Sequence, residues 1–442
     1  MGFLDERKKK KEAEQKRQDA LRSNPLESKL FLDYLKEWQD WGETGKEPRD
    51  ADNDLRYALS LQEKRLDKHG ITKRVSIDVE EGPFDLAKMN SELIINNNHI
   101  IWGKASTSYI KKDTAEVVGK NKQYITFYES IIKAPQDHDV IAKRNYSCPN
   151  CGGVSKIAEL IDGCPYCNTK FTMSELYPKV HNSYILKGLP QGKSVNKEML
   201  KTMIPVGVLF AIISAVMNIK KLSGGEMMLI EYLATVIISG VIGGAVMGYF
   251  LFAFRMLGTL FYEAAKSIPL LFGVTGGKRK VNKMGLDYFP NLNYEYFEGK
   301  ALSLLRCVLF SDKEEDFVQY SGGPLPEEYK NIVDVSYRGG MGVKSVKEIV
   351  EDGKEKIQIS LRIFLENAKI EGGKLRLSRD VANMTMVHDR HTRVNRDFTI
   401  AAVTCRNCGG SFNASRERNC SFCNTPFNAE IEDWVVTELA IL

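Results

Sequence analysis

The stretch Cys405–Phe427, CRNCGGSFNASRERNCSFCNTPF, has a near copy in Cys148–Phe171, CPNCGGVSKIAELIDGCPYCNTKF. Both read C-x-N-C-G-G, then a short loop, then C-x-aromatic-C-N-T-x-F. The loop between the two CxxC pairs has 12 residues in the earlier copy and 11 in the later one. Two CxxC knuckles at this spacing place four thiolates around one ion, and zinc prefers four soft sulfurs in a tetrahedron. The sequence therefore predicts two zinc ribbons.

The number and pairing of the cysteines also favour metal binding over disulfide bonds. The chain has nine cysteines, an odd number, and eight of them stand in the CxxC pairs. Four sulfurs complete a zinc shell, so we expect two structural Zn²⁺ ions, with rubredoxin-like iron and redox-active dithiols as alternatives. The ninth, Cys307, lies in an apolar helical pattern and is predicted to be a core residue. The predicted ligands are Cys148, Cys151, Cys164, Cys167, Cys405, Cys408, Cys420 and Cys423.

The middle of the chain predicts a transmembrane helical hairpin over residues 202–275. Residues 203–219 and 232–254 contain no charged side chain, and each run is long enough to cross a bilayer. A short polar link joins them. The apolar segment that follows Arg255 contains Glu263 and Lys266, so we expect it at the membrane interface or against protein. The alternative for the whole hairpin is a buried core of a soluble protein.

Three glycines recur at every fourth position of the second span: Gly240, Gly244 and Gly248. They share one helix face and allow another helix to approach closely. Packing against the first span is the favoured use, and homo-oligomerisation through the hairpin is the alternative.

The flanking charges predict the orientation. Lysines and arginines are concentrated before the first span and after the second, whereas the link carries only Lys220 and Lys221. Because positive flanks stay on the cytoplasmic side, we expect a multi-pass protein of the cell (inner) membrane with both termini cytoplasmic. The N-terminal run has no apolar segment behind it and is not typical of a secretory signal.

The flanking regions predict mixed secondary structure. Residues 1–70 are predicted to be helical, with one apolar face in the run from Leu30 to Trp41 that packs on the protein itself or on a partner. Residues 71–147 are β-rich, and residues 148–190 hold the first ribbon and a following strand. Residues 286–442 begin with a helix and continue as strands, with the second ribbon inserted at 405–423. The fold class expected is α+β, with helices on a curved antiparallel sheet.

Few signals point to catalysis or nucleic acid. The chain has no P-loop, GxSxG, HExxH or dinucleotide fingerprint. His388 and His391 are close enough in sequence to bind a metal, but a solvated turn is favoured. The net charge of +5 is small for 442 residues, and neither ribbon loop is a basic patch, so no nucleic-acid partner is expected.

With these residues in view, residues 286–442 resemble the bacterial Tim44-like domain proteins. The resemblance rests on DYFPNLNYEYFEGKALSLLRCVLFSD and on the CxxCGGSF…C…C…DWVV ending. It implies an NTF2-like fold, a curved sheet with helices and an apolar pocket, with a zinc ribbon before the last strand. Similar bacterial membrane proteins also carry a hairpin and a first ribbon. The tethering role of the mitochondrial members does not transfer residue by residue.

These observations favour a membrane-anchored, non-enzymatic scaffold or tether. Its zinc-stapled cytoplasmic domains would bind an unidentified protein or the membrane lipid at the inner face. One alternative is an NTF2-like pocket for small-molecule binding or catalysis, with Asp380, His388 and Tyr337 as candidate residues. Another is a channel or transporter subunit, against which both spans lack ionisable residues.

Overall fold

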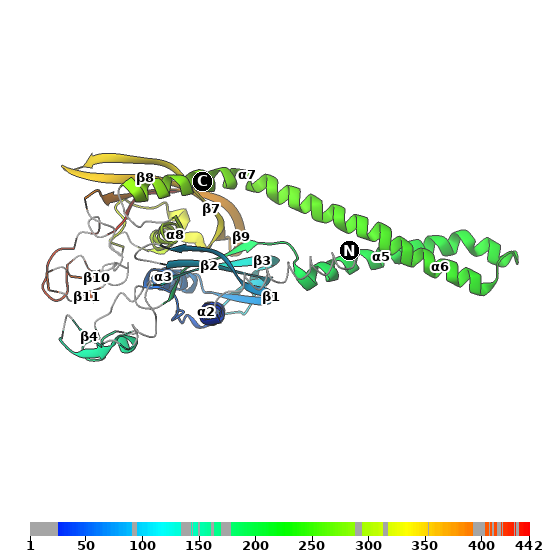
Figure 1. The fold of residues 1–442 in the computed structure, drawn as a ribbon, viewed down its shortest axis with the longest axis horizontal. Coiled ribbons are helices and arrows are strands. Elements are labelled where there is room, and N and C mark those ends of the chain that lie inside the picture. Colours follow the sequence, from blue (N-terminus) through cyan, green and yellow to red (C-terminus); the bar gives the residue numbers. More distant parts are fainter. Residues whose placement is uncertain are drawn as a thin grey trace, which may run out of the picture. The chain divides into compact units, whose positions relative to one another are not determined.

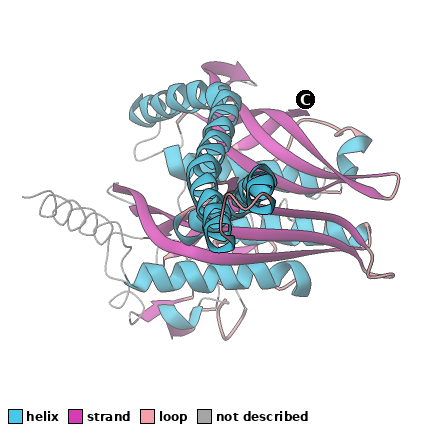
Figure 2. Ribbon diagram, turned by 90° about the vertical axis from the view of Figure 1, so that its right-hand side faces the viewer, coloured by secondary structure: helices cyan, strands magenta, loops and turns pink. Residues whose placement is uncertain are grey.

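The computed structural model contains six helices and two four-stranded antiparallel sheets in the part of the chain that it describes (Figures 1 and 2). It describes residues 25–90, 95–133, 143, 145–148, 151–160, 163–168, 178–287, 294–312, 317–351, 353–391, 403–405, 407–408, 411–412, 417, 419–427, 429 and 433–442. The expected α+β class is confirmed at this level. The chain divides into two compact units, residues 1–188 with 270–442, and residues 189–269.

The first sheet is preceded by two helices, α2 (Pro25–Thr44) and α3 (Asn53–Lys68). Its strands, in sheet order, are β1 (Ile71–Asn90), β2 (Ile95–Lys111), β3 (Val117–Lys133) and β6 (Lys179–Lys187). Helix α2 packs on β1, and the apolar face predicted for this helix is buried in the protein's own core. Phe31 and Tyr34 are fully buried there. The prediction that this helix packs on its own protein is confirmed.

The second sheet has the same strand topology. Helix α8 (Tyr294–Phe310) precedes β7 (Ile332–Glu351), β8 (Lys354–Glu371), β9 (Lys374–Asp389) and β12 (Val435–Ile441), which follow one another across the sheet. A 3₁₀ turn, η4 (Glu327–Asn331), leads into β7. Cys307 is fully buried in α8, as predicted for a core residue.

Each sheet is therefore a three-stranded meander followed by an insertion and a short fourth strand. The insertion in the first sheet holds β4 (Asn145–Ser147), β5 (Val154–Lys156) and a 3₁₀ turn, η1 (Ile157–Leu160). The insertion in the second sheet holds β10 (Val403–Thr404) and β11 (Ser411–Phe412). In both sheets the last strand pairs antiparallel with the third, so each ribbon lies on the connection of a hairpin.

Strand lengths and spacings support an internal repeat. The first strands β1 and β7 have 20 residues each, the second have 17 and 18, and the third have 17 and 16. Cys405 lies 257 residues after Cys148, and Val435 lies 256 residues after Lys179. The repeat thus extends from the ribbons to the sheets that carry them. We call residues 25–187 and 294–441 the first and second repeats.

The two repeats share one hydrophobic core. Helices α3 and α8 pack against each other, and β6 contacts β7. Tyr128 and Tyr184 of the first sheet stack with ring centroids 4.5 Å apart, and Tyr337 of β7 meets Tyr184 edge-on at 4.9 Å. Because these rings belong to both repeats, the two sheets fold as parts of one compact unit.

The unit of residues 189–269 is helical. Helix α5 (Gly192–Ser223) and helix α6 (Leu229–Gly243) pack side by side, as Figure 1 shows. A π-helical turn, η2 (Gly244–Gly248), joins α6 to α7 (Tyr249–Asp287). The helix therefore continues past Arg255 into the segment that was expected at the membrane interface or against protein. The side-chain environment predicted for residues 262–275 lies outside the described residues.

Candidate metal centres

The first cluster is built by two tight turns. Cys148 follows β4, and the Gly152 amide donates to the Cys148 carbonyl at 2.8 Å. Gly152 has a φ of 72°, a left-handed conformation that glycine adopts without strain. A side chain at Gly153 would lie 2.4 Å from the ring of Tyr166. The Gly–Gly pair thus lets the first knuckle turn sharply beneath the aromatic residue of the second.

The second knuckle explains the C-N-T signature. The Asn168 amide donates to the Cys164 carbonyl, and the Asn424 amide donates to the Cys420 carbonyl, both at 2.8 Å. Asn168 and Asn424 have φ values of 58° and 56°. Asparagine is one of the few residues with a side chain that tolerates this left-handed region. The same residue therefore closes the same turn in both ribbons.

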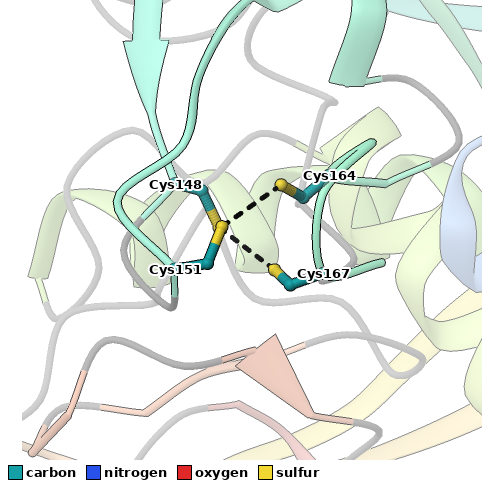
Figure 3. A group of neighbouring side chains, drawn as sticks. All are labelled: Cys148, Cys151, Cys164 and Cys167. Carbon is teal, nitrogen blue, oxygen red and sulfur yellow. Dashed lines mark hydrogen bonds between the residues drawn. The ribbon is translucent and has the colours of Figure 1, made fainter.

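The sulfur positions fit a tetrahedral ion. In each cluster the four Sγ atoms lie within 4.8 Å of one another, and the four cysteines of the first converge in Figure 3. The Sγ atoms of Cys148 and Cys167 are 3.7 Å apart, as are those of Cys151 and Cys164. A tetrahedron with Zn–S bonds of about 2.3 Å has sulfur–sulfur edges of roughly 3.8 Å. Both clusters can therefore hold a metal ion.

The second cluster has matching geometry and an additional hydrogen-bond network. The Sγ atoms of Cys405 and Cys423 are 3.6 Å apart, and so are those of Cys408 and Cys420. The side-chain amide of Asn407 donates to the Cys423 sulfur at 3.7 Å and to the Thr425 hydroxyl at 3.1 Å. Hydrogen bonds from the Thr425 side chain and backbone lower the pKa of Cys423 to about 6. These contacts favour the thiolate that a metal requires.

The other histidines and carboxylates proposed from the sequence do not form a third centre among the described residues. His388 is fully buried, with its ring centroid 5.2 Å from that of Trp434. His391 is exposed and lies 3.2 Å from Glu355. Asp380 accepts from Asn367 and Ser378, and the Tyr337 hydroxyl donates to Glu298 at 2.6 Å. The predicted solvated turn is therefore wrong for His388, which is buried in β9, whereas His391 is exposed.

The glycines of the second span contact the first. A Cβ atom at Gly244 would lie 2.9 Å from the Met203 carbonyl oxygen, and one at Gly248 would lie 2.6 Å from the Met203 Cα. A Cβ atom at Gly240 would lie 3.0 Å from the Cβ of Ala211. These glycines therefore allow the close approach of α5. Residues 194–223 and 229–261 form two helices that are long and apolar enough to cross a membrane.

Sequence reasoning missed a network of buried charges between the repeats. Lys300 of α8 lies 2.6 Å from Asp54 of α3, and it also pairs with Asp433, just before β12. His181 of β6 lies 2.5 Å from Asp52, and its ring stacks on Tyr296 of α8. All these charged side chains are at least nine-tenths buried. The sequence signal was faint, because each residue is isolated within its own element.

A second missed feature is a polar row on the core face of the first sheet. In the register of the sheet, Glu129 on β3 lies opposite His99 on β2 and opposite Ser183 on β6. The Tyr34 hydroxyl of α2 lies 2.6 Å from the Ser183 hydroxyl. Glu129 is fully buried and neither carboxyl oxygen has a hydrogen-bond partner in the described part of the chain. Burial, reinforced by the charge of Asp50, raises the pKa of Glu129 well above its usual value.

Comparisons with known proteins identify no relative. No protein-family model matches the chain, and neither a curated protein nor a solved structure matches it. The fold and the two four-cysteine clusters are therefore the basis for functional inference.

Proposed function

We propose that this protein is a membrane-anchored, non-enzymatic scaffold whose two zinc-clipped ribbons bind a partner protein at the inner face of the cell membrane. The observation that carries the proposal is the repetition of a closed four-thiolate cluster at equivalent points of two sheets. A zinc ion with four protein sulfurs has no open position for water, so such a site stabilises structure and does not catalyse.

The apolar hairpin supports the membrane anchor. In the most apolar window of α5 none of the residues is buried, and in that of α6 and the helix after it 22% are buried. A core helix of a soluble protein would bury most of these side chains. The distribution of lysines and arginines supports cytoplasmic flanks. A homo-oligomer through the hairpin is a weaker proposal, because the glycine face already packs within one chain.

The tips of the ribbons are the proposed contact points. Tyr166 and Phe422 occupy the same position of the C-x-aromatic-C motif. Their exposed fractions are 69% and 50%, high values for large aromatic side chains. Exposed aromatic side chains are typical of protein interfaces because they bury a large area with few rotatable bonds.

The Tim44-like and NTF2-like assignment of residues 286–442 is part of the same proposal. Helix α8, packed on a four-stranded antiparallel sheet, and a four-cysteine cluster before the last strand support it. The resemblance was stated for residues 286–442. The first repeat, residues 25–187, has the same strand topology, so the assignment has to explain that repeat as well.

Photo-crosslinking in membranes tests the scaffold proposal. A photoreactive phenylalanine at position 166 or 422 is expected to capture the same partner protein. The same residue at Val350, beside the β7–β8 turn, or at Leu377 within β9, both exposed apolar positions, serves as a matched control. The double variant Tyr166→Ala, Phe422→Ala should lose the partner and keep both metal ions. Crosslinks to lipid alone, or an equal protein yield at positions 350 and 377, would contradict the proposal.

A further inference from the structure

The two helices of the membrane hairpin pack in a defined register. A Cβ atom at Gly248 would lie 2.6 Å from the Cα atom of Met203, so these two residues lie at one height along the hairpin. A Cβ atom at Gly244 would lie 3.0 Å from the Cα atom of Gly207, further along α5. Other heights can therefore be counted from Met203 and Gly248, at about 1.5 Å per helical residue. We call the end where α5 begins the open end, and the end where α5 and α6 are joined the link end.

Three cations lie at the open end, beyond the height of Met203 and Gly248. Lys201 is about 3 Å beyond Met203, and Lys197 is about 9 Å beyond it. Arg255 is about 10 Å beyond Gly248 on the neighbouring helix α7. All three side chains are exposed. Lys197 and Arg255 therefore lie at nearly the same height.

Among the described residues, a carboxylate neutralises only one of these charges. Lys201 pairs with Glu198 at 2.5 Å. Within the part of the chain that the structure describes, Lys197 and Arg255 form no ion pair. Two exposed cations at one height can thus interact with a ligand of negative charge.

The link end has no such excess of positive charge. Lys220 and Lys221 lie in the last turn of α5, and Glu226 and Glu231 follow in the link and in the first turn of α6. The Glu226 amide donates to the Lys221 carbonyl at 3.0 Å, which holds Glu226 beside the lysines. Two cations are therefore balanced by two carboxylates, so the link end is an internal control for the open end.

In the proposed membrane anchor, Lys197 and Arg255 reach the layer of lipid headgroups. The charge-free run of α5 is residues 203–219, so the hydrocarbon region ends near Lys201. The headgroup layer is roughly 5–8 Å thick on each side, and Lys197 lies about 6 Å beyond Lys201. Phe254 of α7 lies at the height of Lys197 and is 78% exposed, so its ring can pack on the glycerol and the upper part of the acyl chains.

We propose that the open end of the hairpin binds the headgroup of an anionic phospholipid of the phosphatidylglycerol type through Lys197 and Arg255. The guanidinium donates paired hydrogen bonds to phosphate oxygens, and the ammonium adds a point charge. A zwitterionic headgroup binds more weakly, because its own ammonium competes for the phosphate. The inference rests on the proposed membrane anchor and adds a preferred lipid to it, whereas the distribution of positive flanks predicts only the orientation.

Native mass spectrometry of the full chain in a non-ionic detergent tests the proposal. Dioleoyl phosphatidylglycerol is the anionic probe and dioleoyl phosphatidylcholine is the zwitterionic one. Both have the same acyl chains, so a difference in affinity reports the headgroup. Phosphatidylglycerol should bind at least about fivefold more tightly, because each cation near the lipid surface adds about that factor. Equal affinity for the two lipids would overturn the proposal.

Two variants that each remove two cations locate the bound lipid. Lys197→Gln with Arg255→Gln should weaken phosphatidylglycerol binding by about tenfold or more. Lys220→Gln with Lys221→Gln removes the same charge at the link end and should leave the affinity unchanged. Wild-type affinity in the first variant, or an equal loss in both, would show that the lipid is not bound at the open end.

Flotation tests the anchor separately. After reconstitution, the wild type and both variants should float with vesicles of phosphatidylcholine alone, because the apolar spans and not the cations hold the protein in the bilayer. Protein that does not float would contradict the membrane anchor and the inference that rests on it. Protein that floats but shows no preference for phosphatidylglycerol would contradict this inference alone.

Discussion

The two repeats follow the same chain path but differ on the core face of their sheets. Glu129 on β3 and Met384 on β9 occupy equivalent positions. Each lies three residues before the residue that pairs with the first residue of the last strand, which is Ile132 in the first sheet and Val387 in the second. In the first repeat the row through this position reads His99, Glu129, Ser183; in the second it reads Leu361, Met384, Leu439.

The comparison separates the features that both repeats share from those that occur in one repeat alone. The sheet, the ribbon and the left-handed asparagine recur, so they are requirements of the shared fold. The second repeat keeps an apolar row, which shows that the topology needs no buried polar group there. The polar row is therefore specific to the first repeat.

The largest expected effect comes from breaking the contact between the repeats. Lys300→Met leaves Asp54 and Asp433 buried and unpaired, which is expected to lower the free energy of unfolding by about 3–5 kcal/mol. Lys347→Met, at an exposed position of β7, is the control and should change stability little. Urea unfolding followed by circular dichroism measures both. An unchanged unfolding midpoint for Lys300→Met would mean that the repeats do not depend on this network.

The next effect is a pH dependence from the shared core. Burial raises the pKa of Glu298 from 4.5 to about 7, although hydrogen bonds from Tyr337 and Tyr294 oppose the shift. The folded state then binds a proton more tightly than the unfolded state does. The corresponding stability is fully present below pH 4.5 and is lost as the pH rises to about 7, for a total of about 3 kcal/mol.

Glu298→Gln removes this titration while keeping an acceptor for the Tyr337 hydroxyl. Between pH 4.5 and 7 its free energy of unfolding should fall less with rising pH than that of the wild type. Glu328→Gln, at an exposed site, should keep the wild-type slope. Identical slopes for wild type and Glu298→Gln would assign the pH dependence to another group.

The smallest expected effect tests the polar row by exchange between repeats. Glu129→Met introduces the residue of the second repeat and removes a buried carboxyl without partners, so stability should rise by about 1–3 kcal/mol. The reverse change, Met384→Glu, should destabilise the protein. Thermal unfolding at constant pH compares the two. A loss of stability in Glu129→Met would show that Glu129 is already satisfied in the folded protein.

The sequence predicted the features that depend on short spacings. The cysteines of each ribbon lie within 20 residues of one another, and Gly152 and Asn168 are local requirements of the turns. The glycines of the second span could be found for the same reason. The helix at residues 30–41 and the core position of Cys307 followed from apolar periodicity.

The larger repeat could not be found from the sequence, because a fold constrains the pattern of burial more than the identity of each residue. Leu361 and His99 occupy equivalent positions and share no chemistry. The residues that pair across the repeats, such as Lys300 and Asp54, are 246 positions apart. The continuous helix through Arg255 was missed because polarity predicts where a membrane ends and not where a helix ends.

Metal content tests the central claim, that the protein is two copies of one zinc-clipped sheet. The full chain and two double variants, Cys148→Ser with Cys164→Ser and Cys405→Ser with Cys420→Ser, are compared by elemental analysis of the purified protein. The account predicts two zinc ions per chain in the wild type and one in each variant, because each cluster has its own four ligands. Zinc-free wild type, or loss of both ions from either variant, would contradict it.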